Sequence, residues 1–204
     1  MLFHKEIPSR IEEMIIQAIG LATCAIGISM IVRLSDVIAL VLGLLIGAIF
    51  GELIRLEERL NKFAEVIKRK FSHDDRFIEG MVTAFITFCI GPMTIVGSIE
   101  DGLGNPSILF AKSVLDGFMA VAYSASLGIG VIFSTIPMLL YQGSIALIAS
   151  IIKITISTNA LNTLTATGGS ILLGLGIKLL KIKDLKITNL LPALVIAPLI
   201  TIFK

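Results

Sequence analysis

Charged residues are scarce in this sequence, and tryptophan is absent. Asp, Glu, Lys and Arg make up 16% of the 204 residues, whereas 55% are hydrophobic. Three of the stretches that carry no charge at all are residues 14–32, 80–99 and 117–152. Because about 20 apolar helical residues cross a hydrocarbon layer of about 30 Å, these stretches predict transmembrane helices. They lack the apolar–polar alternation of membrane β-barrel strands, and they are too long and too apolar for a soluble core.

Other shortages exclude classes of function. A net charge of only +2 does not favour a nucleic-acid partner. The two histidines, His4 and His73, stand apart from any paired carboxylate–cysteine pattern, and no phosphate-binding loop or metal-spacing motif is present. The sequence therefore predicts neither an enzyme nor a cofactor. Cys24 and Cys89 lie within apolar stretches and are interpreted as small buried side chains, with a disulfide or metal pair as the alternative.

The apolar stretches predict an all-α fold, a polytopic transmembrane helical bundle that forms a single integral membrane domain over residues 1–204. About seven spans are expected, at 14–32, 37–54, 80–99, 108–132, 135–155, 158–177 and 188–203. The second helix is expected to continue into the cytoplasm as an amphipathic extension over 52–71, whose apolar residues recur at helical spacing. This extension is interpreted as a solvated helix on neighbouring loops, and a regulatory or lipid-binding helix is the alternative.

The distribution of lysine and arginine predicts the orientation. With seven spans, thirteen of the 17 cations fall on one side of the membrane, and the other four are Arg33, Lys112, Lys153 and Lys204. The positive-inside rule places the richer side in the cytoplasm. We therefore expect a multi-pass protein of the cell (inner) membrane, with cytoplasmic Lys/Arg-rich loops and the C-terminus outside.

A faint internal repeat is also visible. At an offset of 64 residues, the first expected span aligns with the third, so that Gly27 matches Gly91. The last span can be added, which aligns 26–28, 90–92 and 196–198. Duplication of a parallel unit is one explanation, and chance similarity among apolar helices is the other.

The middle of the third expected span is the best candidate for a functional site. Pro92 has no N–H, and its ring clashes with the carbonyl group four residues earlier, at Phe88, so a broken helix is expected beside Gly91. Within hydrocarbon the freed carbonyl groups need partners inside the protein. Transporters bind ions and substrates at such broken helices. A simple proline kink is the alternative, and a similar break is expected at Ala197–Pro198.

Polar residues follow this expected break. Glu100 and Asp101 stand in a glycine-rich segment that the topology places at the outer surface, where they would collect cations or form an ordinary polar loop. Lys112 and Asp116 stand four residues apart on a helix, where pairing lowers the cost of burial, either as an interfacial pair or in a polar pathway. The candidate substrate- or ion-binding residues are Gly91, Pro92, Thr94, Ser98, Glu100, Asp101, Lys112 and Asp116.

Small residues recur on the second expected span at the spacing of close helix contacts. Gly43, Gly47 and Gly51 form a tandem GxxxG stripe. Such a stripe lets two helix backbones approach each other. Helix packing within one subunit is expected, and a homo-oligomer is the alternative.

The segment 91–103, GPMTIVGSIEDGL, followed by FAKSVLDGF over 110–118, resembles a known family. Together with the opening HKEIPSRIEEMIIQAIGLA and the lysine-rich loop before the last span, it is similar to the uncharacterised bacterial multi-pass membrane proteins of domain of unknown function family 554 (YdfK/YqgA-like). The resemblance covers essentially the whole chain. It implies a helical inner-membrane protein with no settled substrate. It also implies one more apolar span before Met1, which would place the N-terminus outside.

These observations lead to two functional hypotheses. The first is a membrane transporter or channel for a small solute or ion, with the lipid bilayer and a small solute or cation as its partners. The second is a non-transporting membrane scaffold or sensor that acts through the cytoplasmic helix 52–71.

Overall fold

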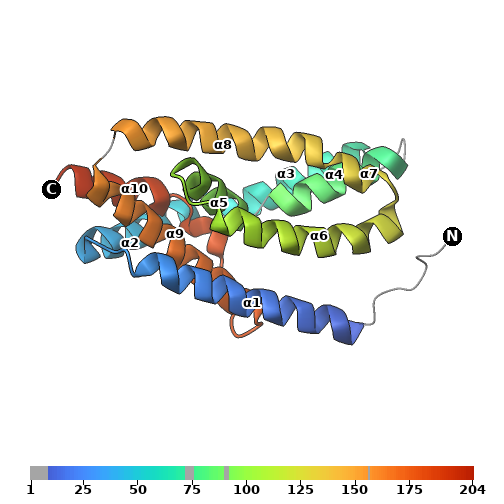
Figure 1. Cartoon of the computed structure of the whole chain (residues 1–204), viewed down its shortest axis with the longest axis horizontal. Helices are drawn as coiled ribbons and strands as arrows, with labels where there is room; N and C mark the ends of the chain where they lie inside the picture. Colours follow the sequence, from blue (N-terminus) through green and yellow to red (C-terminus); the bar gives the residue numbers. More distant parts are fainter. Residues whose placement is uncertain (1–8, 72–75, 90–91, 156) are drawn as a thin grey trace.

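The computed structural model describes residues 9–71, 76–89, 92–155 and 157–204. These residues form helices joined by short connections, which confirms the all-α prediction (Figure 1). The helices are α1 (Ser9–Ile31), α2 (Val37–Leu53), α3 (Leu56–Phe71), α4 (Arg76–Cys89), α5 (Pro92–Gly102), α6 (Ser107–Leu127), α7 (Gly130–Phe133), α8 (Thr135–Thr155), α9 (Thr158–Leu179), the 3-10 turn η1 (Ile187–Leu190) and α10 (Ala193–Ile202). In Figure 1, α8 runs along one long edge and α1 along the opposite edge, with α5, α6 and α9 between them.

Glycine residues bring the helix pairs into close contact. Helix α1 lies antiparallel to α9, and a Cβ atom placed on Gly27 would lie 2.7 Å from the carbonyl oxygen of Gly169. Helix α2 packs on η1 and α10, where Gly43, Gly47 and Gly51 face the backbone of Ala197, Ala193 and Asn189, respectively. The missing side chains let the two backbones meet. The GxxxG stripe thus lies on a contact within one chain.

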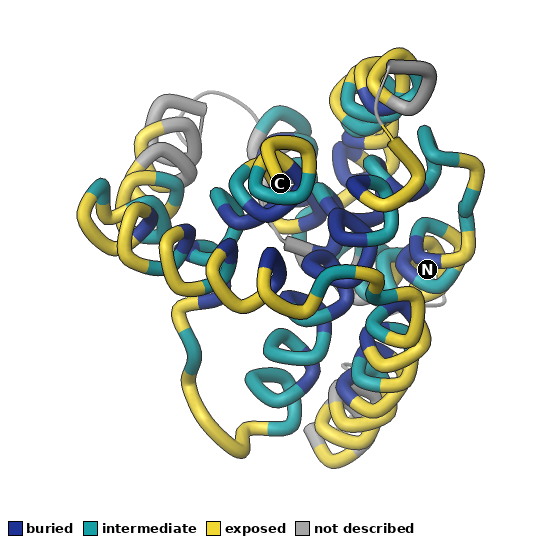
Figure 2. Tube along the Cα trace, turned by 90° about the vertical axis from the view of Figure 1, so that its left-hand side faces the viewer, coloured by how far each residue is buried: buried dark blue, intermediate teal, exposed yellow. Residues whose placement is uncertain are grey.

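Much of the outer surface of the bundle is apolar. On α2, the glycines face inward, while large side chains point away from the bundle: Val37, Ile38, Val41, Leu42, Leu45, Ile46, Ile49, Phe50 and Leu53 are all exposed. Helix α8 also exposes large apolar side chains, with Leu139 71% exposed and Leu140 68% exposed. Figure 2 shows exposed residues around the outside of the helices and buried residues on their inner faces. An apolar surface of this extent suits hydrocarbon rather than water.

The predicted interruption in the third span is present. Helix α4 ends at Cys89 and α5 begins at Pro92, with an angle of 69° between 80–89 and 93–102. Ile90 and Gly91 lie outside the described residues. Pro92 is the first residue of α5, a position where its fixed φ suits the helix and its missing N–H has no helical acceptor.

Two other helix expectations differ from the structure. An amphipathic helix is present in the predicted extension 52–71, but it is a separate helix, α3, because Arg55 adopts a left-handed conformation (φ 50°) and the chain bends by 48°. The predicted break at Ala197–Pro198 does not occur, since Pro198 lies inside α10. Contacts with α2 and α9 hold α10 on two sides, and packed membrane helices tolerate proline in this way.

The seven expected spans are not confirmed. Two of the described segments, 130–152 and 158–179, are long and apolar enough to cross a membrane, and the bent pairs α2–α3 and α4–α5 would raise the number to four. Helix α10 has 10 residues, or about 15 Å, which is about half of a bilayer core. The proposed repeat is not confirmed either, because α1 and α10 run unbroken through the positions that align with the α4–α5 interruption.

Candidate functional site

A cavity of about 520 Å³ lies beside the α4–α5 interruption. Helices α1, α3, α4, α5, α6 and α9 and the η1 turn all contribute to its wall. Its charged side chains come from three different helices, and three threonine residues also line it: Glu57, Lys112, Asp116, Lys178, Thr87, Thr94 and Thr188. A second, shallower hollow near the C-terminus is lined mainly by apolar residues of α2 and α10.

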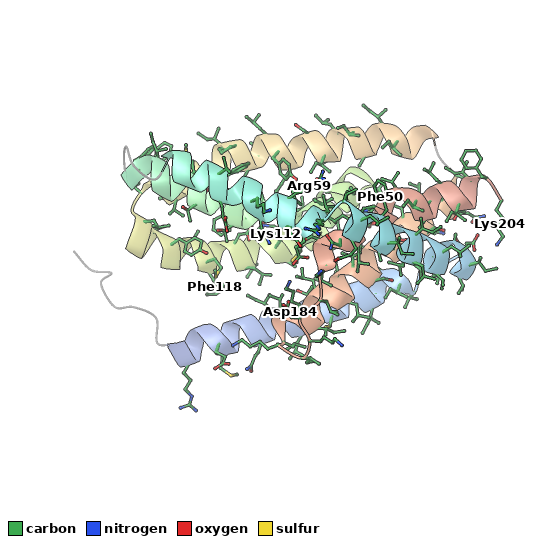
Figure 3. The ribbon with its side chains drawn as sticks, turned by 180° about the vertical axis from the view of Figure 1, so that it is seen from behind. Phe50, Arg59, Lys112, Phe118, Asp184 and Lys204 are labelled. Carbon is green, nitrogen blue, oxygen red and sulfur yellow. The ribbon has the colours of Figure 1, made fainter. Side chains whose placement is uncertain are left out.

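Lys112 and Asp116 form an ion pair across one turn of α6. The Lys112 side chain is 7% exposed and that of Asp116 is 20% exposed, so the pair lies within the protein. Figure 3 shows Lys112 between the helices. The Lys112 ammonium nitrogen also lies 6.0 Å from the centre of the Phe88 ring, which stacks on Tyr123 at 5.9 Å. Opposite charge and an aromatic face thus both offset the cost of burying this ammonium group.

Thr94 supplies a hydrogen-bond donor at the interruption. Its hydroxyl group donates to the carbonyl oxygen of Phe88 at 2.7 Å, and both residues are buried. This is the carbonyl group four residues before Pro92, which has no N–H to donate to it. The side-chain bond therefore satisfies a buried acceptor that the proline leaves free, and it fixes the start of α5 relative to the end of α4.

Replacing Thr94 with valine is expected to destabilise the protein by about 1–3 kcal/mol, because valine keeps the shape but leaves the Phe88 carbonyl group without its donor. Thermal unfolding in detergent, followed by the reaction of the two free cysteines with a fluorogenic thiol reagent, measures the effect. Thr94→Ser keeps the hydroxyl group and serves as the control. Equal melting temperatures for Thr94→Val and Thr94→Ser would contradict the assigned hydrogen bond.

A second ion pair joins α3 to α9 at the same cavity. The Lys178 ammonium nitrogen lies 3.2 Å from a carboxylate oxygen of Glu57 and 3.1 Å from one of Asp184. Glu57 also accepts a hydrogen bond from the N–H of Thr188 at 3.3 Å, and its own N–H donates to the Asn189 side chain at 2.8 Å. The start of α3, the end of α9 and η1 are therefore held together beside the cavity.

The sequence did not single out Glu57 or Lys178. The two residues are 121 positions apart, so no local pattern connects them. One available signal was the placement of Lys178 in the last turn of an apolar helix, where a cation is costly unless it is paired.

A neighbouring polar contact extends this network toward the C-terminal end of α2. Lys186 forms an ion pair with Glu52 at 2.6 Å, and the Asn189 amide donates to the other Glu52 oxygen at 2.7 Å. The hydrogen bond that Lys186 donates to Glu52 raises the pKa of the Lys186 ammonium group, and the negative charge of the Glu52 carboxylate raises it further. Both side chains are more than half exposed, so this contact marks a solvated end of the bundle.

The acidic pair predicted at the outer surface is arranged differently. Helix α5 continues to Gly102, so Glu100 and Asp101 lie on a helix and not in a turn. Their side chains therefore point in different directions. Glu100 is 2% exposed and accepts hydrogen bonds from Thr165 at 2.5 Å and Asn105 at 3.2 Å. Asp101 is half-buried. The expectation of a surface position is thus wrong for Glu100, because α9 covers its carboxylate.

The predicted residues therefore separate into groups. Thr94, Lys112 and Asp116 line the cavity, whereas Glu100 and the buried Ser98 lie farther along α5. Gly91 lies outside the described residues. Within the ranges that the structure describes, no three His, Cys, Asp or Glu side chains gather closely enough to hold a metal ion, and both cysteines are free thiols.

The apolar outer surface, the glycine-packed helices and the interrupted helix beside a charged cavity are the features of a helical membrane protein. Comparison with known proteins gives the family. The chain belongs to the family described as "Protein of unknown function (DUF554)", which matches residues 1–202 and confirms the resemblance noted in the sequence.

Two relatives match nearly the whole chain. "Uncharacterized membrane protein YdfK" of Bacillus subtilis (strain 168) is 35% identical over 204 residues, covering 98% of this chain and 87% of the relative. "Uncharacterized protein YqgA" of Escherichia coli (strain K12) is 34% identical over 203 residues, covering 96% and 86%, respectively. No solved structure matches significantly.

Proposed function

We propose that this protein is a transporter or channel for a small polar solute or ion, and that the cavity beside the α4–α5 interruption is its binding site. The observation that carries the proposal is the presence of two ion pairs, Lys112–Asp116 and Glu57–Lys178, around one cavity inside a bundle with an apolar exterior. Charged side chains are costly in a membrane protein and usually mark the path of a solute or ion.

The size and lining of the cavity fit a small polar ligand. About 520 Å³ lies within the range of small-molecule sites, which is about 300–1,000 Å³. Lys112 and Asp116 present both signs of charge from one wall, and the hydroxyl groups of Thr87 and Thr94 add hydrogen-bonding capacity. A ligand that bears charge or several polar groups would bind by adding to, or competing with, the contacts that these side chains make with each other and with the backbone.

The two ion pairs have different consequences for movement. Lys112 and Asp116 belong to one helix, so the pair remains intact when helices shift relative to each other. Glu57 and Lys178 belong to different helices, so separation of α3 from α9 would break their contact. We propose that the Glu57–Lys178 pair closes one end of the cavity. By the positive-inside rule, this lysine-rich end faces the cytoplasm of the cell.

Transport into proteoliposomes tests the proposal, with a panel of labelled polar solutes, cations and anions. Asp116→Asn is expected to reduce the flux of the transported species about 10-fold or more, because a charge-assisted contact of about 1.5–3 kcal/mol is lost. Glu58→Gln is the matched control, since Glu58 is exposed, adjacent to Glu57 and does not line the cavity. Its flux should equal that of the wild type.

Two outcomes would count against transport. One is a folded, monodisperse wild-type protein that moves no member of a broad panel. The other is equal flux through the wild type and Asp116→Asn, which would exclude this cavity as the pathway.

A scaffold or sensor role is the second candidate, and α3 favours it. Val66 is 62% exposed on this amphipathic helix, with exposed Glu65 beside it. A partner that docks on α3 would cover this side chain. A stoichiometric partner that co-purifies with the wild type but is lost on Val66→Asp, together with the absence of flux, would favour this role.

A further inference from the structure

The wall of the cavity beside the α4–α5 interruption combines two kinds of side chain. Of its sixteen lining residues, eight are apolar and eight are polar or charged. Five of the apolar residues, from α1, α6 and α9, are only half-buried: Ile19, Leu115, Met119, Leu175 and Leu179. A bound inorganic ion would leave this apolar surface in contact with water, whereas a ligand with an apolar part would cover it.

On α6, charged and apolar side chains share the side of the helix that lines the cavity. Lys112, Leu115, Asp116 and Met119 all belong to the lining. Spacings of three and four residues place them in one row along the helix. Lys112 and Asp116 form an ion pair, and Met119 follows Asp116 by three residues. A ligand that lies along this row therefore contacts a pair of opposite charges and adjacent apolar side chains.

Helix α9 presents the same combination. Leu175, Lys178 and Leu179 line the cavity at spacings of three and four residues, and Lys178 pairs with Glu57 of α3. The cavity thus has apolar side chains beside both of its ion pairs. This arrangement is complementary to an amphiphilic molecule, which has a charged head and an apolar tail.

The charges of the wall balance each other. Two carboxylates and two ammonium groups occur among the lining residues that the structure describes: Glu57, Asp116, Lys112 and Lys178. Each ammonium group pairs with one of the two carboxylates. A ligand with a net charge would leave that charge unbalanced among partly apolar walls, which is costly. A dipolar head, with one ammonium group and one carboxylate, adds a partner of each sign and keeps the sum at zero.

The Lys112–Asp116 pair retains the hydrogen-bonding capacity to hold such a head. An ammonium group has three donors and a carboxylate has several acceptor positions, so the contact between these two side chains exhausts neither. The Asp116 side chain is 20% exposed, which leaves it accessible to a ligand. Lys178, in contrast, has three partners for its three donors, at 3.2, 3.1 and 3.0 Å: Glu57, Asp184 and the carbonyl group of Leu185.

We propose that the cavity binds a zwitterion with an apolar chain, of the kind that an aliphatic α-amino acid exemplifies. The ligand carboxylate accepts hydrogen bonds from Lys112, and the ligand ammonium group donates to Asp116. The apolar chain contacts Leu115, Met119 and the neighbouring leucine residues of α9. The transport of this ligand rests on the proposed function, whereas its binding does not.

Equilibrium dialysis of the full chain in lipid nanodiscs tests the apolar part of the site, with empty nanodiscs to correct for partition into lipid. The probes are the free amino acids alanine, 2-aminobutyrate, norvaline and norleucine, which share one dipolar head and grow by one methylene group at a time. Each added methylene group is expected to strengthen binding about two- to fourfold, because its burial is favourable. Equal affinities along the series overturn the apolar part of the site.

Two analogues of norleucine test the dipolar head. Hexanoate lacks the ammonium group and pentylamine lacks the carboxylate, while both keep the chain. Norleucine is expected to bind about 10-fold or more tightly than either analogue, because each analogue loses one charge-assisted hydrogen bond. If hexanoate or pentylamine binds as tightly as norleucine, the site does not select a dipolar head and the proposal fails.

Substitutions place the ligand in the cavity. Asp116→Asn is expected to weaken norleucine binding about 10-fold without weakening hexanoate binding. Met119→Ser should reduce the gain in affinity per methylene group, and Val121→Ser is its control, because Val121 is 63% exposed on the same helix and does not line the cavity. Unchanged norleucine binding in Asp116→Asn, or equal effects of Met119→Ser and Val121→Ser, contradicts this placement. If a variant does not fold, the comparisons of probes with the wild type still decide the ligand class.

Failure of this inference differs from failure of the proposed function. If the wild type binds none of these probes, the inference is overturned, although flux of an inorganic ion from the solute panel would still support transport. If norleucine binds as expected but does not enter proteoliposomes, the ligand class stands and transport of this ligand is overturned.

Discussion

Replacing Asp116 with alanine is expected to lower the melting temperature of this protein by roughly 10 °C. The substitution leaves the ammonium group of Lys112, whose side chain is 7% exposed, without its partner. Removing one member of a buried pair costs about 3–5 kcal/mol, because the remaining charge is neither paired nor solvated. For a chain of this size, each kcal/mol corresponds to about 2–4 °C. The contact with the Phe88 ring reduces this cost but does not replace a carboxylate.

The double variant Lys112→Met/Asp116→Ala distinguishes loss of the pair from loss of packing. It removes the buried charge together with its partner, so most of the melting temperature should return. Thermal unfolding can be followed through the thiols of Cys24 and the buried Cys89, since the chain has no tryptophan to report on it. If Asp116→Ala melts at the wild-type temperature, the Lys112 ammonium group must contact water or another anion, and the assigned dependence of Lys112 on Asp116 is wrong.

The second large effect is expected on α2. In Gly47→Ala, the new Cβ atom would lie 2.6 Å from the backbone nitrogen of Ala193 and 2.8 Å from its Cα atom. Because both atoms belong to the backbone, α2 and α10 must separate, and we expect a loss of about 1–3 kcal/mol. A melting experiment in detergent measures it.

Gly143 on α8 offers a matched control for the same chemical change. Nothing lies within 4 Å of a Cβ atom placed there. Alanine is favoured over glycine in a helix by up to about 1 kcal/mol, so Gly143→Ala should leave stability unchanged or raise it. Gly47→Ala should therefore lower the stability of the protein, whereas Gly143→Ala should not. A change of oligomeric state at an unchanged melting temperature in Gly47→Ala would instead indicate that the glycine stripe joins two copies of the chain.

Local chemistry made part of this structure predictable. The helical class follows from long apolar stretches, and the interruption follows from the missing N–H of Pro92, even though the donor that satisfies Phe88 had to be seen in the structure. The bend at Arg55 had no such signal, because arginine rarely adopts a positive φ and neither proline nor glycine marks the position. The chemistry of proline alone also predicted a helix break at Pro198 that does not occur, because packing maintains α10 there.

The candidate site was predictable only where its residues are close in the sequence. Lys112 and Asp116 are one helical turn apart, so helical spacing was enough to pair them. Glu57 with Lys178, and Glu100 with Thr165, meet across 121 and 65 residues. Hydropathy assigns each charged residue to the membrane boundary, and it carries no information on the partner that allows a carboxylate to be buried. That is why Glu100 was expected at the surface.

The inward glycines and outward large side chains have a consequence for how this family can vary. Positions such as Leu139 and Leu140, which point away from the bundle, have to remain apolar but have no fixed shape, so isoleucine, valine or phenylalanine should serve equally well there. Gly27, Gly47 and Gly169 leave no room even for a methyl group. These three glycines are therefore among the least replaceable residues of the chain, whereas many of its large exposed residues can be exchanged freely, which reverses the pattern of a protein that folds in water.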